Sequence, residues 1–163
     1  MEPHYRILVI DDNVDIHADF RKILNPETRA SSNALRAIES ALFDAPIASQ
    51  RNAPQFEIDS AYQGEEGLRL VQESVRQNKR YHVVFCDMRM PPGWNGLRTS
   101  LELMQADPGL RIVICSAYCD YSADEIAAAI PDRSGQLSFR SKPFVAEDIV
   151  RLARSLAESC VAV

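Results

Sequence analysis

Blocks of hydrophobic and polar residues alternate along the chain, and most of them have the length of a strand or a helix. Short apolar runs that end abruptly in polar residues predict buried parallel strands. Between these runs, apolar residues recur every three or four positions, which predicts helices with one buried face. We expect strands at residues 5–10, 56–61, 81–86, 110–115 and 136–140, and helices at residues 14–24, 64–75, 95–106, 123–130 and 144–158.

The regular alternation of strands and helices predicts an α/β protein with an open parallel sheet and helices on both of its faces. Residues 56–61 alternate apolar and polar side chains, which is typical of an edge strand. The ligand site of an open parallel sheet lies beyond the carboxyl ends of the strands, where the strand order reverses. The polar residues at the strand ends are therefore the first candidates for chemistry.

Residues 25–54 interrupt this alternation. Ser32 or Asn33 is a candidate N-cap for a helix with spaced apolar residues, and a polar segment bounded by prolines follows it. Because the strand and helix pattern resumes directly afterwards, we interpret residues 25–54 as a partly helical insertion within a single domain of residues 1–163.

The composition excludes several classes of protein. With 163 residues the chain is long enough to bury one sizeable core. A net charge of −5 offers no basic surface for direct binding of nucleic acid or of an anionic membrane. No apolar stretch is long enough to cross a bilayer and no signal peptide is evident, so we expect a cytoplasmic protein. The four cysteines show no CxxC spacing, which argues against a zinc site.

Polar residues follow four of the predicted strands directly. Taken singly, each has an ordinary role as a helix cap, a turn residue or a surface charge. Together they bring three carboxylates, a hydroxyl and an ammonium to one edge of the sheet. They are Asp11 and Asp12 after the first strand, Asp87 after the third, Ser116 after the fourth and Lys142 after the fifth.

Such a cluster of carboxylates is stable only if a cation lies among them, because like charges raise one another's pKa. Mg²⁺ suits the cluster, since it prefers oxygen ligands and keeps several waters. A carboxylate beside that ion is able to attack a phosphorus atom and form an acyl phosphate. The metal, the ammonium and the hydroxyl would then stabilise the charge on the phosphoryl oxygens.

Four segments of the chain resemble the signature blocks of response-regulator receiver domains of two-component signalling systems. The resemblance extends from Tyr5 to about Glu158, with the insertion left out. It implies a flavodoxin-like (βα)5 open parallel sheet with strand order 2-1-3-4-5 and helices on both faces. The four segments are ILVIDDN at residues 7–13, VVFCDMRMP at residues 83–91, IVICSA at residues 112–117 and KPF at residues 142–144.

The resemblance implies a role for each acidic residue. Asp87 matches the phosphoacceptor, which also contacts the metal ion. Asp12 matches the direct Mg²⁺ ligand, and Asp11 matches its partner, which often acts through water. The backbone carbonyl of Arg89, two residues past the acceptor, matches a third ligand from the protein.

The resemblance also implies residues that bind the phosphoryl group and respond to it. Ser116 and Lys142 match the hydroxyl and the ammonium that contact the group, and a cis peptide is expected before Pro143. Phe139 matches an aromatic switch residue, although a phenylalanine in a strand is often simply part of the core. The loop that contains Trp94 departs from the family pattern, and we expect Trp94 either near the site or packed against the neighbouring helix.

The implied function is a receiver domain, not a turnover enzyme. It would take a phosphoryl group from a histidine kinase or a phosphotransfer protein and change its binding to a partner or to a covalently linked output or kinase domain. The chain is either a stand-alone regulator or a part of a larger protein, and a homodimer is possible.

Two alternatives remain open. A phosphatase or phosphotransferase of the haloacid-dehalogenase type also uses an Asp at a strand end, but its second Asp is replaced here by Arg89. A degenerate receiver that only scaffolds is the other alternative, and the intact set of site residues argues against it.

Overall fold

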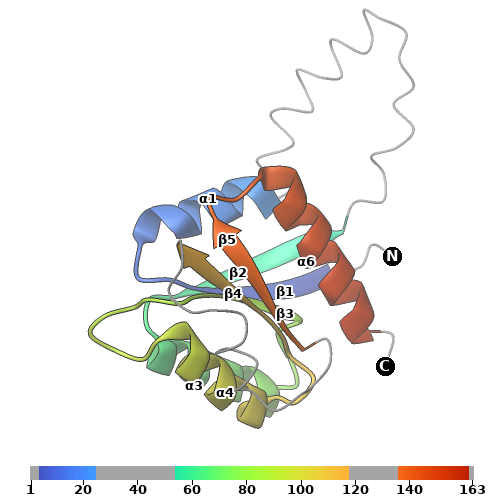
Figure 1. Ribbon diagram of the computed structural model, residues 1–163. Coiled ribbons are helices and arrows are strands. Elements are labelled where there is room, and N and C mark those ends of the chain that lie inside the picture. Colours follow the sequence, from blue (N-terminus) through green and yellow to red (C-terminus); the bar gives the residue numbers. More distant parts are fainter. Residues whose placement is uncertain (1–3, 25–53, 118–135, 162–163) are drawn as a thin grey trace, which may run out of the picture.

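The computed structural model describes residues 4–24, 54–117 and 136–161, which form a five-stranded sheet with helices on both sides (Figure 1). The strands are β1 (His4–Ile10), β2 (Gln55–Ala61), β3 (Val83–Asp87), β4 (Arg111–Ala117) and β5 (Leu137–Lys142). The helices are α1 (Val14–Leu24), α3 (Gly64–Arg76), α4 (Gly96–Ala106) and α6 (Ala146–Val161).

The strands run parallel in the order β2-β1-β3-β4-β5, which confirms the predicted fold class. In Figure 1, α1 and α6 cover one face of the sheet, and α3 and α4 cover the other. The strand order reverses at β1, which pairs with β2 on one side and β3 on the other. A ligand site is therefore expected beyond the carboxyl ends of β1 and β3.

The alternation of side chains along β1 explains why the sheet has a core on each face. Leu8 and Ile10 pack into the core under α3 and α4, and Ile7 and Val9 pack into the core under α1 and α6. Successive side chains of a strand point to opposite faces, so a central strand covered on both sides is apolar throughout. All four of these side chains are almost completely buried.

Three strands extend further toward the carboxyl edge than the sequence predicted. Asp87, Ser116 and Lys142 belong to the ends of β3, β4 and β5, whereas the sequence pattern placed them just after these strands. The ladder continues because backbone groups, not side chains, form it: Asp87 pairs with Cys115, and Ser116 pairs with Ser141. A polar side chain at a strand end therefore does not mark the end of the pairing.

The last helix begins later than predicted. The first helical hydrogen bonds run from the backbone amides of Asp148 and Ile149 to the carbonyl of Val145, so α6 begins at Ala146 instead of residue 144. Phe144 instead packs its ring edge-on against Phe20 of α1, with 5.6 Å between the ring centroids. The loop between β5 and α6 thus packs against α1, the other helix on this face of the sheet.

Two of the predicted segments lie outside the described residues. They are the insertion at residues 25–54, apart from Pro54, and the helix at residues 123–130. Across residues 4–24, 54–117 and 136–161, no helix has both the length and the apolar character that a bilayer crossing requires.

The start of α4 lies directly against the end of β3, and this contact yields a test of the packing. The Gly96 amide donates to the Met88 carbonyl at 2.8 Å, and a Cβ at Gly96 would lie 2.5 Å from the Asp87 carbonyl oxygen. A backbone atom cannot rotate away as a side chain can. We expect Gly96→Ala to lower the free energy of unfolding by about 1–3 kcal/mol, measured by urea denaturation.

Gly109→Ala is the matched control for this substitution. A Cβ at Gly109 would lie 3.5 Å from Asp107 Oδ1, which is an ordinary contact. Its free energy of unfolding should stay within about 0.5 kcal/mol of the wild-type value. Equal losses at both positions would show that the close approach of Gly96 to β3 is not the cause.

Candidate functional site

Acidic residues from two neighbouring strands meet at the carboxyl edge of the sheet. Asp11 and Asp12 follow β1, and Asp87 ends β3, which pairs with β1. One carboxylate oxygen of each residue lies within 4.8 Å of the others. Asp11 is buried, Asp87 is half-buried and Asp12 is exposed. The structure thus brings together the three carboxylates that the sequence analysis singled out.

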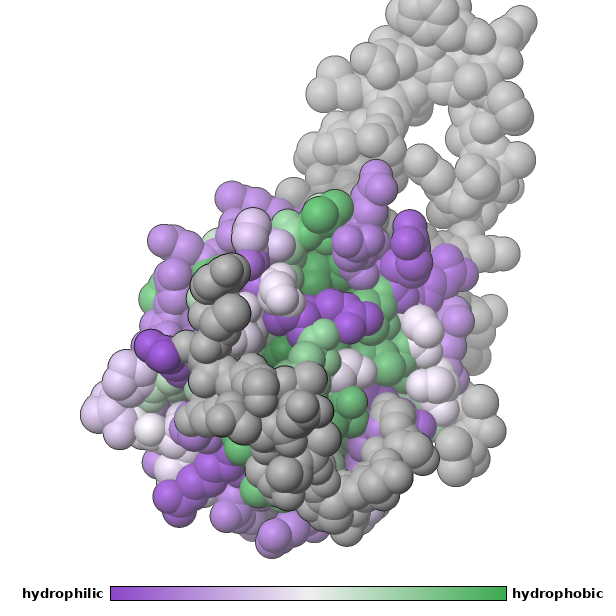
Figure 2. Space-filling view, viewed as in Figure 1, coloured by the Kyte–Doolittle hydropathy of each residue, from purple (hydrophilic) through white to green (hydrophobic). Residues whose placement is uncertain are grey.

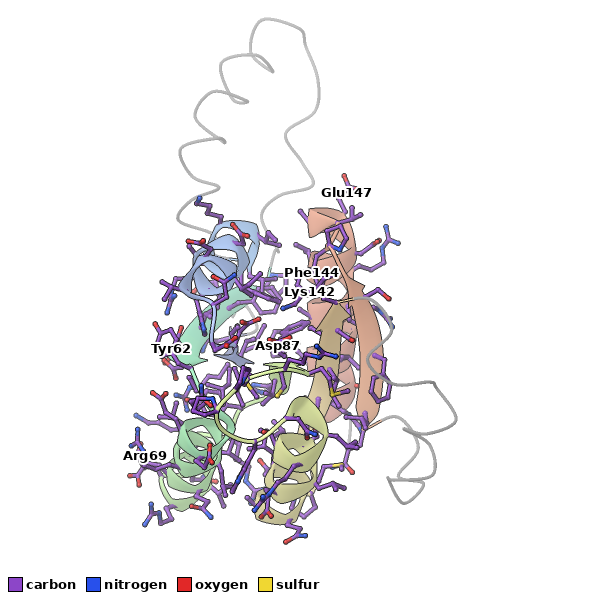
Figure 3. All side chains as sticks on the ribbon, turned by 60° about the vertical axis from the view of Figure 1, so that its left-hand side comes forward. Tyr62, Arg69, Asp87, Lys142, Phe144 and Glu147 are labelled. Atoms are coloured by element: carbon purple, nitrogen blue, oxygen red, sulfur yellow. The ribbon has the colours of Figure 1, made fainter. Side chains whose placement is uncertain are left out.

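Lys142 at the end of β5 joins two of these carboxylates. Its Nζ lies 3.0 Å from Asp11 Oδ2 and 3.1 Å from Asp87 Oδ1. In Figure 3, Asp87 lies in the middle of this edge, with Lys142 above it and Tyr62 on the opposite side. One ammonium faces three carboxylates, so the cluster keeps an excess of negative charge that one divalent cation would balance.

The environment shifts the pKa values of Asp87 and Lys142 in the same direction. Burial raises the pKa of Asp87, the charge of Asp11 raises it further, and Lys142 offsets these effects only in part. Burial on its own lowers the pKa of Lys142, but the hydrogen bond to Asp11 and the charges of both carboxylates outweigh burial, so its pKa is raised. Lys142 therefore keeps its charge, while ionised Asp87 is poorly stabilised.

Asp11 is held in place through both its side chain and its backbone. Its Oδ1 accepts a hydrogen bond from the Asn13 amide at 2.9 Å, and its Oδ2 accepts the one from Lys142. Its own amide donates to the Ala61 carbonyl of β2 at 3.1 Å. Both carboxylate oxygens of Asp11 are therefore engaged, which fits an orienting residue better than an attacking one.

His17 of α1 completes this support, and the sequence analysis missed it. Its Nε2 lies 2.7 Å from the Asp11 carbonyl oxygen, and its buried ring packs against Tyr62 at 4.6 Å between centroids. A signal was present, because His17 lies three and seven positions before Phe20 and Leu24, which are buried on the same face of α1. A histidine on that face needs a polar partner, and the strand end provides one.

The remaining candidate residues lie in β4, in β5 and in the loops that follow β3 and β5. Ser116 donates a hydrogen bond to the Ala117 carbonyl at 3.3 Å, so its hydroxyl contacts its own strand. Phe139 of β5 is half-buried against the core under α3 and α4. Arg89 has an exposed side chain in the loop after β3. The peptide before Pro143 is cis, as expected.

Trp94 contacts the neighbouring helix. The guanidinium carbon of Arg98 in α4 lies 4.6 Å from the centroid of the indole ring, a cation–π arrangement. The loop between β3 and α4 contains a second cis peptide, between Pro91 and Pro92. Trp94 thus packs against α4, as one of the two expectations had it. Whether Trp94 also senses charge at the carboxylate cluster stays a prediction.

The donor set suits a hard divalent cation. All the side-chain donors of the cluster are carboxylate oxygens, which Mg²⁺ prefers to nitrogen or sulfur. Cys86 and Cys115 directly precede the candidate residues Asp87 and Ser116 in the sequence. Both are buried free thiols, and burial is the main reason that their pKa values are raised. They therefore remain protonated and are poor metal ligands.

Comparison with protein families gives one match. The sequence profile described as "Response regulator receiver domain" matches residues 45–154. Its range begins after β1 and therefore includes Asp87, Ser116 and Lys142 but not the acidic pair Asp11 and Asp12. The place of the acidic pair in the site rests on the structure. Comparison with curated protein sequences gave no match.

Solved structures share the fold at low sequence identity. A CheY-like receiver domain protein from Methanospirillum hungatei is 16% identical, with a TM-score of 0.64 and 97% of each chain covered. The response regulator TrrA from Thermotoga maritima, in complex with Mg²⁺ and BeF, is 22% identical, with a TM-score of 0.57 and coverage of 93% of this chain and 98% of that one.

A third similar structure is the N-terminal domain of a response regulator/sensory box/GGDEF three-domain protein from Carboxydothermus hydrogenoformans. It is 14% identical, with a TM-score of 0.62 and coverage of 96% of this chain and 97% of that one. Identities this low extend the likeness to the fold alone.

The raised pKa of Asp87 predicts a gain in stability when its charge is removed. Native Asp87 binds its proton more tightly than the unfolded chain does, so ionisation costs stability as the pH rises above the ordinary value of 3.8, and the cost is complete above the native pKa. We expect Asp87→Asn to raise the free energy of unfolding in EDTA at neutral pH. The difference should shrink toward zero below about pH 4.

Urea denaturation between about pH 4 and pH 8 measures this effect. Asp148→Asn is the matched control, because Asp148 is an exposed carboxylate of α6, and it should give no such gain. A loss of stability in Asp87→Asn at neutral pH would mean that the contact with Lys142 outweighs the cost of burial.

Proposed function

The chain belongs to the response regulator receiver domain family, and on that premise we propose that it accepts a phosphoryl group on Asp87. The arrangement of Asp87 and Lys142 is the observation on which the proposal rests. Asp87 Oδ1 accepts a hydrogen bond from Lys142, whereas no described residue donates a hydrogen bond to its Oδ2. Both oxygens of Asp11 are engaged, and of the other two carboxylates only that of Asp87 contacts Lys142, so Asp87 Oδ2 is the proposed nucleophile.

The proposed reaction is an in-line displacement at phosphorus. Asp87 Oδ2 attacks the phosphorus atom, the bond between phosphorus and the donor group breaks, and its electron pair leaves with the donor. The product is an acyl phosphate on Asp87. Lys142 remains within reach of the new phosphoryl oxygens and stabilises their charge.

We propose that Mg²⁺ is held by Asp12, Asp11, Asp87 and the backbone carbonyl of Arg89. The excess of carboxylates over ammonium groups supports this assignment, and so does the Mg²⁺ complex of TrrA. When bound, the ion would neutralise negative charge on the site and on the phosphoryl oxygens. Asp11 would orient the others, since its oxygens are already engaged by Asn13 and Lys142.

The response to phosphorylation is proposed to pass through β4 and β5. Ser116 and Lys142 lie near the ends of these paired strands, and Phe139 lies three residues before Lys142 on β5. In this proposal the Ser116 hydroxyl turns from the Ala117 carbonyl to the phosphoryl group. The half-buried Phe139 then follows into the space that Ser116 leaves.

A histidine kinase or a phosphotransfer protein is the proposed donor. Beside Lys142, a groove of about 640 Å³ between α1 and α6 has apolar walls that include Ile16, Ile23 and Phe144. Apolar residues reach the surface between these helices among hydrophilic ones in Figure 2. A protein donor would cover such an apolar groove while presenting its phosphoryl group to Asp87.

The output is proposed to be a change in partner binding, and the domain a switch instead of a turnover enzyme. A partner or a covalently linked domain would recognise the phosphorylated state. The N-terminal domain from the three-domain protein of Carboxydothermus hydrogenoformans is an example of such a linkage in a protein of this fold.

Labelling with a small phosphodonor tests the proposal. Incubation with acetyl phosphate and Mg²⁺ should add one base-labile phosphoryl group, detected by intact-protein mass spectrometry. Asp87→Asn should abolish the label, because its amide cannot attack phosphorus, and Asp12→Ala should weaken it through loss of Mg²⁺. The control Asp148→Asn, at an exposed carboxylate, should label normally. Labelling that survives Asp87→Asn would refute the assignment of Asp87.

Trp94 provides a separate test of metal binding, because it is the only tryptophan. Its loop follows β3, at whose end Asp87 lies, so charge added there should change its emission on Mg²⁺ addition and again with beryllofluoride. Asp12→Ala should move the Mg²⁺ midpoint by about tenfold or more to higher concentration, and Asp148→Ala should not. Flat emission in both titrations, together with normal labelling, would show that Trp94 does not sense the site.

A further inference from the structure

A second cavity lies at the opposite pole of the sheet, at the amino ends of β3 and β4. Its volume is about 420 Å³, and its walls include Arg80, His82, Asp107, Arg111 and Cys160. The end of α6 lies on this side of the sheet in Figure 1, far along the strands from Asp87. A cavity of this size is within the range of small-molecule sites.

Several hydrogen-bond acceptors around this cavity are already engaged. Asp107 Oδ1 accepts from the Gly109 amide at 3.1 Å and from Arg80 at 3.3 Å. The Gly109 carbonyl accepts from the Cys160 thiol at 3.2 Å, and the His82 carbonyl accepts from the Arg111 amide at 3.2 Å. These three acceptors are therefore not free to bind the donors of a ligand.

Donors, by contrast, are in excess. Arg111 Nε is buried and has no hydrogen-bond partner among the described residues. His82 Nδ1 accepts a hydrogen bond from the Arg6 amide at 3.0 Å, so the proton of the neutral ring is on Nε2. Burial lowers the pKa of His82, which keeps the ring neutral at neutral pH. Arg111 thus lines the cavity with a guanidinium group whose Nε has no acceptor among the described residues.

The charges of the cavity agree with this reading. Two guanidinium groups, of Arg80 and Arg111, face one carboxylate, that of Asp107. Asp107 is almost completely buried and is paired with Arg80 at 3.3 Å, whereas no ion pair involves Arg111 among the described residues. The cavity thus has a positive balance in a chain whose net charge is −5.

We propose that this cavity binds the anionic group, a carboxylate or a phosphate, of a small molecule. Arg111 would donate to the anion in a charge-assisted hydrogen bond, and Arg80 would add a second positive charge at the rim. The site is separate from Asp87 and does not depend on phosphorylation there.

An NMR titration of the full chain in EDTA tests the proposal. Inorganic phosphate and acetate are added separately to ¹⁵N-labelled protein, with sodium chloride at matched ionic strength as the reference. We expect at least one of the two anions to give saturable shifts of the backbone amides at residues 80–82, 107 and 109–111. The anion that binds more tightly identifies the preferred chemical group.

Substitutions then assign the binding to the guanidinium groups. Arg111→Gln should weaken it by about tenfold or more, as expected for loss of a charge-assisted hydrogen bond. Arg69→Gln removes an equal charge from α3 and should leave the affinity unchanged. The Arg69 side chain is exposed and points away from the body of the protein in Figure 3. If Arg111→Gln fails to fold, Arg80→Gln replaces it, because the Arg80 side chain is 55% exposed.

Three results would overturn the proposal. They are shifts that do not saturate with either anion, shifts confined to the region of Asp87 and Lys142, and equal affinity in the wild type and the arginine variants.

Discussion

The sharing of one ammonium between two carboxylates organises the carboxyl edge of this protein. Lys142 reaches Asp11 and Asp87 from a strand that pairs with neither β1 nor β3, so the contact ties three strands together across the sheet. Because the side chains are largely buried, the attraction acts in a medium that screens it less than water does. The same contact leaves the third carboxylate, Asp12, uncompensated, and this imbalance favours a divalent cation.

The two apolar cores allow charge to be concentrated in this way. Each face of the sheet is covered by a pair of helices, so the central strands are packed on both sides. Asp87 still pairs with Cys115 at the end of β3, and Lys142 still pairs with Ala117 at the end of β5. The side chains at the edge are thus positioned by the backbone ladder, and little conformational freedom is lost when they meet a ligand.

Much of this arrangement was predictable from the sequence, because it depends on periodicity and on residue order. Strands, helices and the meeting of Asp11, Asp87 and Lys142 follow from apolar runs that end in polar residues. The support from His17 was not predictable in the same way, because its partner is a backbone carbonyl, which no residue type encodes. The cavity at the other pole depends on the register of β3 and β4 and on the end of α6, so its residues show no common pattern in the chain.

The close contact between Gly96 and the end of β3 has a mechanical meaning. The Asp87 carbonyl and the Met88 backbone lie against α4 with no room for even one added carbon, so α4 supports the backbone at Asp87 directly. Strand β5, in contrast, is bonded to β4 alone and has a free second edge within the described sheet. A displacement of Asp87 toward α4 would therefore meet backbone atoms at once, whereas β5 has a neighbouring strand on one side only.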